Sequence, residues 1–199
     1  MSFNSKYTPT SRLACVALVA FGVTMPSADA SGGLGFTYGV YSHDSILGVD
    51  HVGIDGTGNP YTGDTQCKRK RPILCVNVDG SPRPNYDVAD GQEFYQGWAQ
   101  GHYTTTLPIS GSLITSAANG DARCATSFGV GWRMAEFHDG VWVQGMNALN
   151  YGNTLGSLSA WPAGPYNGGG HTAWGYGHVR QDMRLWVNVN DQTANCWNP

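Results

Sequence analysis

The sequence predicts an α+β domain made of short antiparallel strands, one main helix and a long ordered loop region. Only 13% of the 199 residues are charged, whereas 12% are aromatic and 28 residues are glycine. This composition is typical of β-rich folds with many turns. One segment, 116–128, has a helical pattern, and another, 184–190, alternates between apolar and polar residues as a strand does.

Several other segments are expected to be short strands separated by glycine-rich turns. Pro108 would place the strand that contains it at the edge of a sheet, because proline cannot donate a backbone hydrogen bond. The loop at 53–64 is rich in Gly, Asp, Asn and Thr. We expect strands at 35–41, 73–78, 132–135 and 141–144, and a hairpin of 93–99 and 103–109 that turns at Gly101.

The helix predicted at 116–128 has a start signal and a stop signal. Thr115 is the expected N-cap, and Gly129 is expected to end the helix in a left-handed conformation. The face directed at the core would carry Ala117, Cys124, Ala125 and Phe128.

The segment 184–190 is expected to be a strand with one buried face. Successive side chains of a strand point to opposite sides, so its residues separate into two sets. The apolar set, directed at the core, is Leu185, Val187 and Val189, and the outward set is Trp186, Asn188 and Asn190.

The amino terminus has the features of a cleaved secretory signal. Two basic residues precede an apolar run at 13–23, which is too short to cross a bilayer as a helix. Ala28 and Ala30 then supply the small residues that signal peptidase requires. We expect a signal peptide over 1–30 and one mature domain over 31–199, which is secreted, periplasmic or at the cell surface.

The charge of the mature domain is negative. Removing Lys6, Arg12 and Asp29 with the signal leaves 9 of the 11 basic and 13 of the 14 acidic residues. This balance argues against nucleic acid or an anionic membrane as a partner, and no later stretch is apolar enough for membrane insertion. The basic run 68–71 could dock an acidic polymer, but such runs are usually solvated loops.

An even number of cysteines remains after the signal, which predicts two disulfides in an oxidising compartment. These cysteines are Cys67, Cys75, Cys124 and Cys196. Three pairings are possible, and we favour Cys67 with Cys75 and Cys124 with Cys196, which would tie the helix to the last strand. A zinc site is the alternative, but no C-x-x-C pair or neighbouring histidine supports it.

The longest predicted loop covers 150–182 and is rich in aromatic residues. Loops of this length are uncommon without a function, and a large exposed aromatic area normally contacts a ligand or partner. The loop either packs its own aromatic side chains or forms a binding surface.

The C-terminal half contains a series of motifs in a fixed order. A helix with a cysteine ends at Gly129, the residues Gly-Trp-Arg-Met-Ala follow at 131–135, and a long loop and a closing strand precede Cys196. This order resembles the C-type-lectin-like domains of secreted bacterial proteins. The resemblance implies that Cys124 pairs with Cys196 and that 150–182 carries the ligand. The Glu-Pro-Asn or Gln-Pro-Asp triplet of the calcium-dependent lectins is absent.

Two polar clusters have both a chemical and a structural interpretation. The loop oxygens of Asp55, Thr57, Asn59 and Asp64 could bind calcium, but Pro60 stands where an EF-hand has glycine, so a plain turn is favoured. The second cluster is Glu136, His138 and Asp139. These residues are expected to brace a turn, and acid-base catalysis is the alternative.

The leading hypothesis is a non-enzymatic recognition module that binds a glycan or a surface protein without an obligatory cofactor. One alternative is a self-associating extracellular structural subunit, and another is a secreted hydrolase that uses His138 with Glu136 or Asp139. The predicted ligand-binding residues are Trp161, Tyr166, Trp174, Tyr176, Trp186, Asn188 and Asn190.

Overall fold

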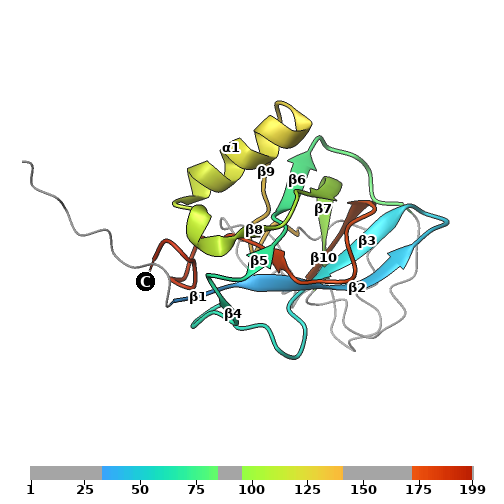
Figure 1. The fold of residues 1–199 in the computed structure, drawn as a ribbon. Helices are drawn as coiled ribbons and strands as arrows, with labels where there is room; N and C mark the ends of the chain where they lie inside the picture. The colour runs from blue at the N-terminus through green and yellow to red at the C-terminus, as the bar shows by residue number, and fades with distance from the viewer. Residues whose placement is uncertain (1–32, 85–95, 141–171, 199) are drawn as a thin grey trace, which may run out of the picture.

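The computed structural model describes residues 33–84, 96–140 and 172–198. These residues form an α+β fold in which a helix packs beside a curled sheet (Figure 1). No helix in these segments is long and apolar enough to cross a membrane. In chain order the elements are β1 (Leu34–Gly35), β2 (Thr37–Asp44), β3 (Val49–Gly53), β4 (Thr65–Gln66), β5 (Lys70–Arg71), β6 (Leu74–Val78), β7 (Gln96–Thr105), β8 (Ile109–Ser110), the 3₁₀ turn η2 (Gly111–Leu113), α1 (Ala117–Phe128), β9 (Trp132–Met134), β10 (Thr172–Gly177) and β11 (Leu185–Trp186).

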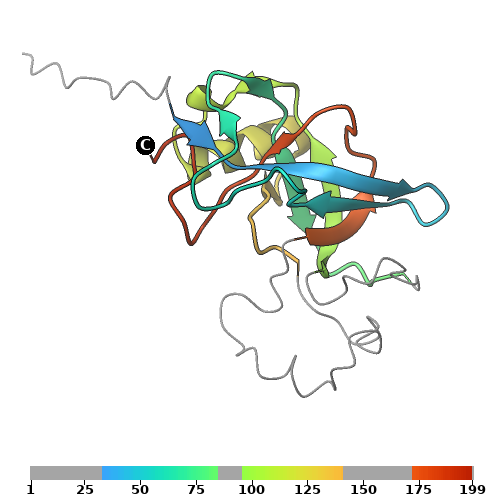
Figure 2. The ribbon, with the colours of Figure 1, turned by 90° about the horizontal axis from the view of Figure 1, so that it is seen from below.

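The main sheet has seven strands in the order β11-β2-β3-β10-β7-β6-β9. Its neighbours are antiparallel except for β10 and β7, which run parallel. Two short pairs, β1 with β4 and β5 with β8, lie outside this sheet. The hairpin of β2 and β3 projects from one end of the described fold (Figure 2).

The predicted helix and three of the predicted strands are confirmed. Ser116 rather than Thr115 is the N-cap, because its Oγ accepts a hydrogen bond from the backbone N of Asn119 at 3.0 Å. Gly129 ends the helix with a φ of 104°. Strands lie at 37–44, 74–78 and 132–134, close to the expected ranges.

The predicted hairpin that turns at Gly101 is wrong, because β7 continues through this residue. Gln100 has a φ of 56°, which marks an irregularity in the strand. A Cβ atom on Gly101 would lie 1.9 Å from the carbonyl oxygen of Asn77 in β6. The glycine is therefore required for close contact between strands and not for a turn.

Replacing Gly101 with alanine is expected to lower the free energy of unfolding by about 1–3 kcal/mol, because the added methyl group meets backbone atoms. Gly56→Ala is the matched control, since a Cβ at that position has no neighbour within 4 Å. Urea unfolding followed by tryptophan fluorescence measures both variants. Equal stability of the two variants would contradict the close approach of β6 and β7.

The C-terminal strand is buried on both sides, so half of its predicted pattern is wrong. Leu185, Val187 and Val189 are buried as expected, but Trp186 is also only 2% exposed. The indole Nε1 of Trp186 donates to the carbonyl of Ile109 at 3.2 Å. The chain after 190 folds back to β1 and covers this face, which the alternating pattern does not reveal.

Part of the predicted loop at 150–182 is a central strand. β10 lies between β3 and β7, although its sequence contains two glycines and two aromatic residues. A Cβ on Gly175 would lie 2.6 Å from the ring of Tyr103, so a larger residue would not fit there. The predicted strand at 141–144 and the loop residues 150–171 lie outside the described residues.

All four cysteines of the described residues form disulfides, but both favoured pairings are wrong. The bonds join Cys67 to Cys196 and Cys75 to Cys124, with Cα–Cα distances of 5.6 and 5.7 Å. Since α1 packs on β9, which pairs with β6, Cys124 lies close to Cys75 in β6. The C-terminal tail returns to β1, where Cys196 meets Cys67. The pairing of Cys124 with Cys196 that the lectin resemblance implied is therefore not present.

Replacing both Cys75 and Cys124 with alanine is expected to lower the free energy of unfolding by about 2–4 kcal/mol. The bond closes a loop with a sequence separation of 49, and its loss increases the entropy of the unfolded chain. Urea unfolding measures the change. Mapping of non-reduced peptides provides the check on connectivity, and a peptide that links Cys67 to Cys75 would contradict the structure.

Candidate functional site

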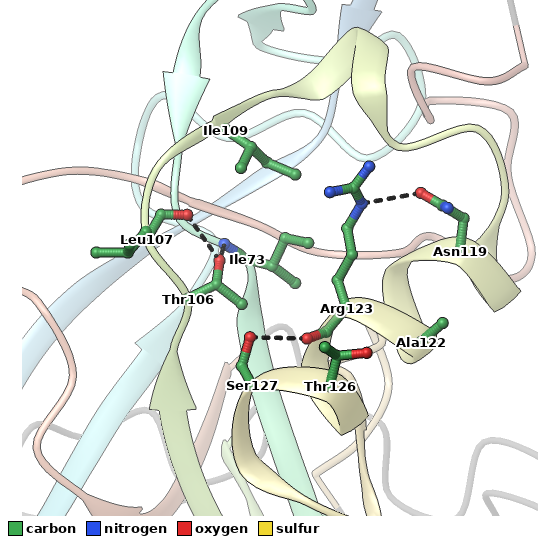
Figure 3. A pocket seen from close by; sticks show the side chains of 9 residues that line it. All are labelled: Ile73, Thr106, Leu107, Ile109, Asn119, Ala122, Arg123, Thr126 and Ser127. Carbon is green, nitrogen blue, oxygen red and sulfur yellow. Dashed lines mark hydrogen bonds between the residues drawn. The ribbon is translucent and has the colours of Figure 1, made fainter.

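A groove runs along one side of α1 and has a volume of about 420 Å³ (Figure 3). This volume lies in the range typical of small-ligand sites. The helix supplies one wall through residues at spacings of three and four, which lie on one face of a helix. These wall residues are Asn119, Ala122, Arg123, Thr126 and Ser127.

The opposite wall is the chain that leaves β7, and it is mainly aliphatic. Leu107 is 84% exposed at the rim, Ile109 is partly buried, and the buried Ile73 lies between the walls. Thr106 fixes this wall, because its Oγ1 accepts from the backbone N of Ile73 at 2.9 Å and donates to the carbonyl of Leu107 at 3.0 Å. The apolar surface is therefore held in place by hydrogen bonds.

Arg123 places a positive charge at one end of the groove. Its Nε donates to the side-chain oxygen of Asn119 at 3.0 Å (Figure 3). Its Nη2 donates to the carbonyl of Leu113 at 2.8 Å. Among the described residues, no carboxylate lies within ion-pair distance of this guanidinium. The charge is thus oriented by neutral groups and available to a ligand.

The sequence predicts α1 but not this groove. The predicted core face of the helix carries Cys124, whereas the groove lies on the neighbouring face. The signal was present in the polar stripe at 119, 123, 126 and 127, which Ala122 interrupts. The facing wall at 106–109 was not predictable, because β7 was expected to turn at Gly101.

The predicted ligand residue Trp174 lies in an aromatic row that crosses three strands. Its ring stacks on His51 with centroids 4.4 Å apart and an interplanar angle of 5°. His51 stacks in turn on Tyr41 at 4.7 Å. Tyr176 packs edge-on against Trp98 at 5.2 Å. These aromatic side chains therefore pack extensively against one another.

The other predicted ligand residues are distributed over different places. Trp186 is buried, and β2 and β3 separate its strand from β10. Asn188 is buried and donates to Glu136 at 3.1 Å, while the exposed Asn190 donates to the same carboxylate at 3.3 Å. Trp161 and Tyr166 lie outside the described residues. The structure thus brings Asn188 and Asn190 together, but not with Trp174.

Each residue of the hydrolase alternative has a side-chain partner outside that group. His138 Nε2 lies 3.3 Å from a carboxylate oxygen of Asp191. Asp139 pairs with Arg133 and accepts from the backbone N of Glu136 at 2.6 Å. Glu136 is bonded to the two asparagines. The carboxylates at 136 and 139 therefore brace the local chain.

The turn predicted within 53–64 is confirmed, and its oxygen atoms have protein partners. Asp55 accepts from the backbone N of Thr57 at 2.9 Å, Asn59 from that of Tyr61 at 3.0 Å, and Asp64 from that of Thr37 at 3.2 Å. Over the described residues, no group of three or more His, Cys, Asp or Glu side chains is arranged to hold a metal.

Comparisons of the chain with protein-family models, curated proteins and solved structures found no match. The candidate site is therefore defined by its own geometry and chemistry.

A buried carboxylate and two histidines form a hydrogen-bonded chain at another part of the sheet. Asp50 is fully buried and accepts from the backbone N of Val179 at 2.9 Å. His43 Nδ1 lies 2.9 Å from Asp50, and His43 Nε2 lies 3.3 Å from Nδ1 of the exposed His178. Burial raises the pKa of Asp50, although the hydrogen bonds from Val179 and His43 act in the opposite direction.

The stability of the protein is expected to depend on the ionisation of Asp50. Because its pKa is raised in the folded state, its contribution is complete below the unfolded pKa of about 4 and is lost as pH rises through the folded pKa. Asp50→Asn removes this titration. Urea unfolding of the wild type and of Asp50→Asn, measured from below the unfolded pKa to above the folded pKa, should show the stability advantage of the wild type decreasing as pH rises. An advantage that increases with pH would contradict the raised pKa of Asp50.

Proposed function

We propose that this chain is an exported, non-enzymatic recognition module that binds a glycan in the groove beside α1. The observation that carries this proposal is the composition of the groove, which has an aliphatic wall opposite a wall of amide, hydroxyl and guanidinium groups. A sugar ring has an apolar face and a polar edge, so it matches both walls at once. Pockets with this combination of apolar lining and few oriented polar groups are typical of ligand sites.

The ligand is expected to carry a negative group. Arg123 is held by Asn119 and Leu113, which leaves part of the guanidinium able to bond to a carboxylate or sulfate. Fixing the side chain in advance reduces the entropy lost when the ligand binds. A sugar acid with its acidic group at Arg123 and its ring against Leu107 and Ile109 would use the whole groove.

We also propose a C-type-lectin-like arrangement for the domain. A helix with a buried cysteine, a glycine stop and the Trp-Arg strand β9 occur in the expected order. The bond between Cys75 and Cys124 is a departure from the implied pairing. In this proposal the ligand site is the groove beside α1, whose described lining comes from α1, Ile73 and the chain at 106–109.

Export is part of the same proposal. Two disulfides are typical of proteins that mature in oxidising compartments. A cleaved signal over 1–30 would deliver the domain to the cell exterior, the periplasm or the cell surface. N-terminal sequencing of the protein recovered from these fractions should give Ser31 as the first residue, and an intact Met1 would exclude cleavage.

Filling the groove is expected to abolish glycan binding. Ala122→Trp places an indole between the walls, and Ala118→Trp is the matched control because Ala118 is exposed on α1 but does not line the groove. On an array of neutral and acidic glycans, Ala122→Trp should lose at least about tenfold in affinity while Ala118→Trp stays close to the wild type. Arg123→Gln should weaken acidic glycans more than neutral ones.

The proposal fails if the correctly folded wild type binds no glycan, or if the two tryptophan variants behave alike. Circular dichroism establishes that each variant is folded. Light scattering on the same samples detects self-association, and concentration-dependent assembly that Ala122→Trp abolishes would favour the structural subunit instead.

A further inference from the structure

Some of the described basic side chains form ion pairs with carboxylates, and others do not. Arg133, Arg180 and Arg184 each form an ion pair with at least one aspartate. Five other cations form no ion pair with a described carboxylate, and we call them the basic face. They are Lys68, Arg69, Lys70, Arg71 and Arg123.

The members of the basic face come from segments that are joined directly. β5 pairs with β8, with Lys70 opposite Ser110 and Arg71 opposite Ile109. Ile109 also lines the groove beside α1. The guanidinium of Arg123 bonds to Leu113 at the end of the η2 turn that follows β8. The backbone that carries the basic run is therefore linked to the groove through β8 and η2.

The backbone of the basic run is ordered, which distinguishes it from a solvated loop. Cys67, directly before the run, is fully buried and bonded to Cys196. Its carbonyl accepts from the backbone N of Ser112 at 2.9 Å and from the hydroxyl of Ser110 at 2.9 Å. The carbonyl of Arg69 accepts from Gly111 at 3.4 Å. The cations thus extend from a preorganised backbone.

Acidic side chains are nearly absent from these segments. The ranges 65–78 and 96–120 contain no Asp or Glu, and within α1 the one acidic residue is Asp121. The carboxylate of Asp121 accepts from the backbone N of Met134 in β9 at 3.0 Å, so it is engaged with β9. On a chain with a formal net charge of −3, the local positive field directs anions to this face.

We infer that the glycan of the proposed function is an acidic polysaccharide. One of its sugars binds in the groove, and further acidic sugars bind along residues 68–71. This inference rests on the proposed function and specifies its ligand. A single acidic sugar at Arg123 would leave the four cations of the run unused, whereas a polymer with repeated charges engages them together. Among the described residues that line the groove, none carries an aromatic ring to stack on a base, which favours a polysaccharide over a nucleic acid.

Calorimetric titration of the full chain with polygalacturonate and with digalacturonate tests the inference. The polymer should bind at least about tenfold more tightly per site, and raising the salt concentration should weaken its binding more. Arg69→Gln should reduce polymer affinity by about threefold to fivefold with little effect on the disaccharide. Arg180→Gln is the matched control, because it removes the same charge from an exposed arginine outside the face.

The outcomes separate the inference from the function on which it rests. If the disaccharide binds in the groove as tightly as the polymer and Arg69→Gln equals Arg180→Gln, the inference is overturned and the glycan module stands. If neither uronate nor any array glycan binds, both are overturned. If single-stranded DNA displaces polygalacturonate at equal charge concentration and equal salt, a nucleic-acid ligand replaces the polysaccharide.

Discussion

Two disulfides that meet in one buried cluster hold the irregular half of this domain in place. The bonds Cys67–Cys196 and Cys75–Cys124 lie in the same apolar cluster as the buried Trp186. One attaches the C-terminal tail to the chain that follows β4, and the other attaches α1 to β6 of the sheet. Short strands and long connections bury little apolar surface per residue, so covalent links contribute much of the rigidity in such folds.

The candidate site depends directly on this cluster. Cys124 and the polar stripe of α1 belong to the same helix, so the bond to Cys75 also fixes one wall of the groove. Cys67 fixes the start of the basic run in the same way. Binding groups that are positioned by the covalent framework lose little conformational entropy when a ligand arrives. The framework therefore serves recognition as well as stability.

The sequence was sufficient where a local pattern determines the structure. Gly129 ends α1, the β-branched run at 74–78 forms β6, and Leu185 and its apolar neighbours are buried. It was insufficient where distant segments decide the outcome. The disulfide pairing depends on where α1 lies in the fold. Gly101 is required because the backbone of β6 passes close to it. One wall of the groove is formed by the residues that follow β7. Each of these features arises from contacts between parts of the chain that are far apart in sequence.

The position of β10 determines when the sheet can close. This strand lies between β3 and β7, yet it comes after both in the chain, at residues 172–177. Until it arrives, β3 and β7 each present an unpaired edge, and such edges readily pair with other chains. A polypeptide that emerges amino end first therefore leaves both edges unpaired until residue 177 has been made, and during that interval each edge is open to pairing with another chain.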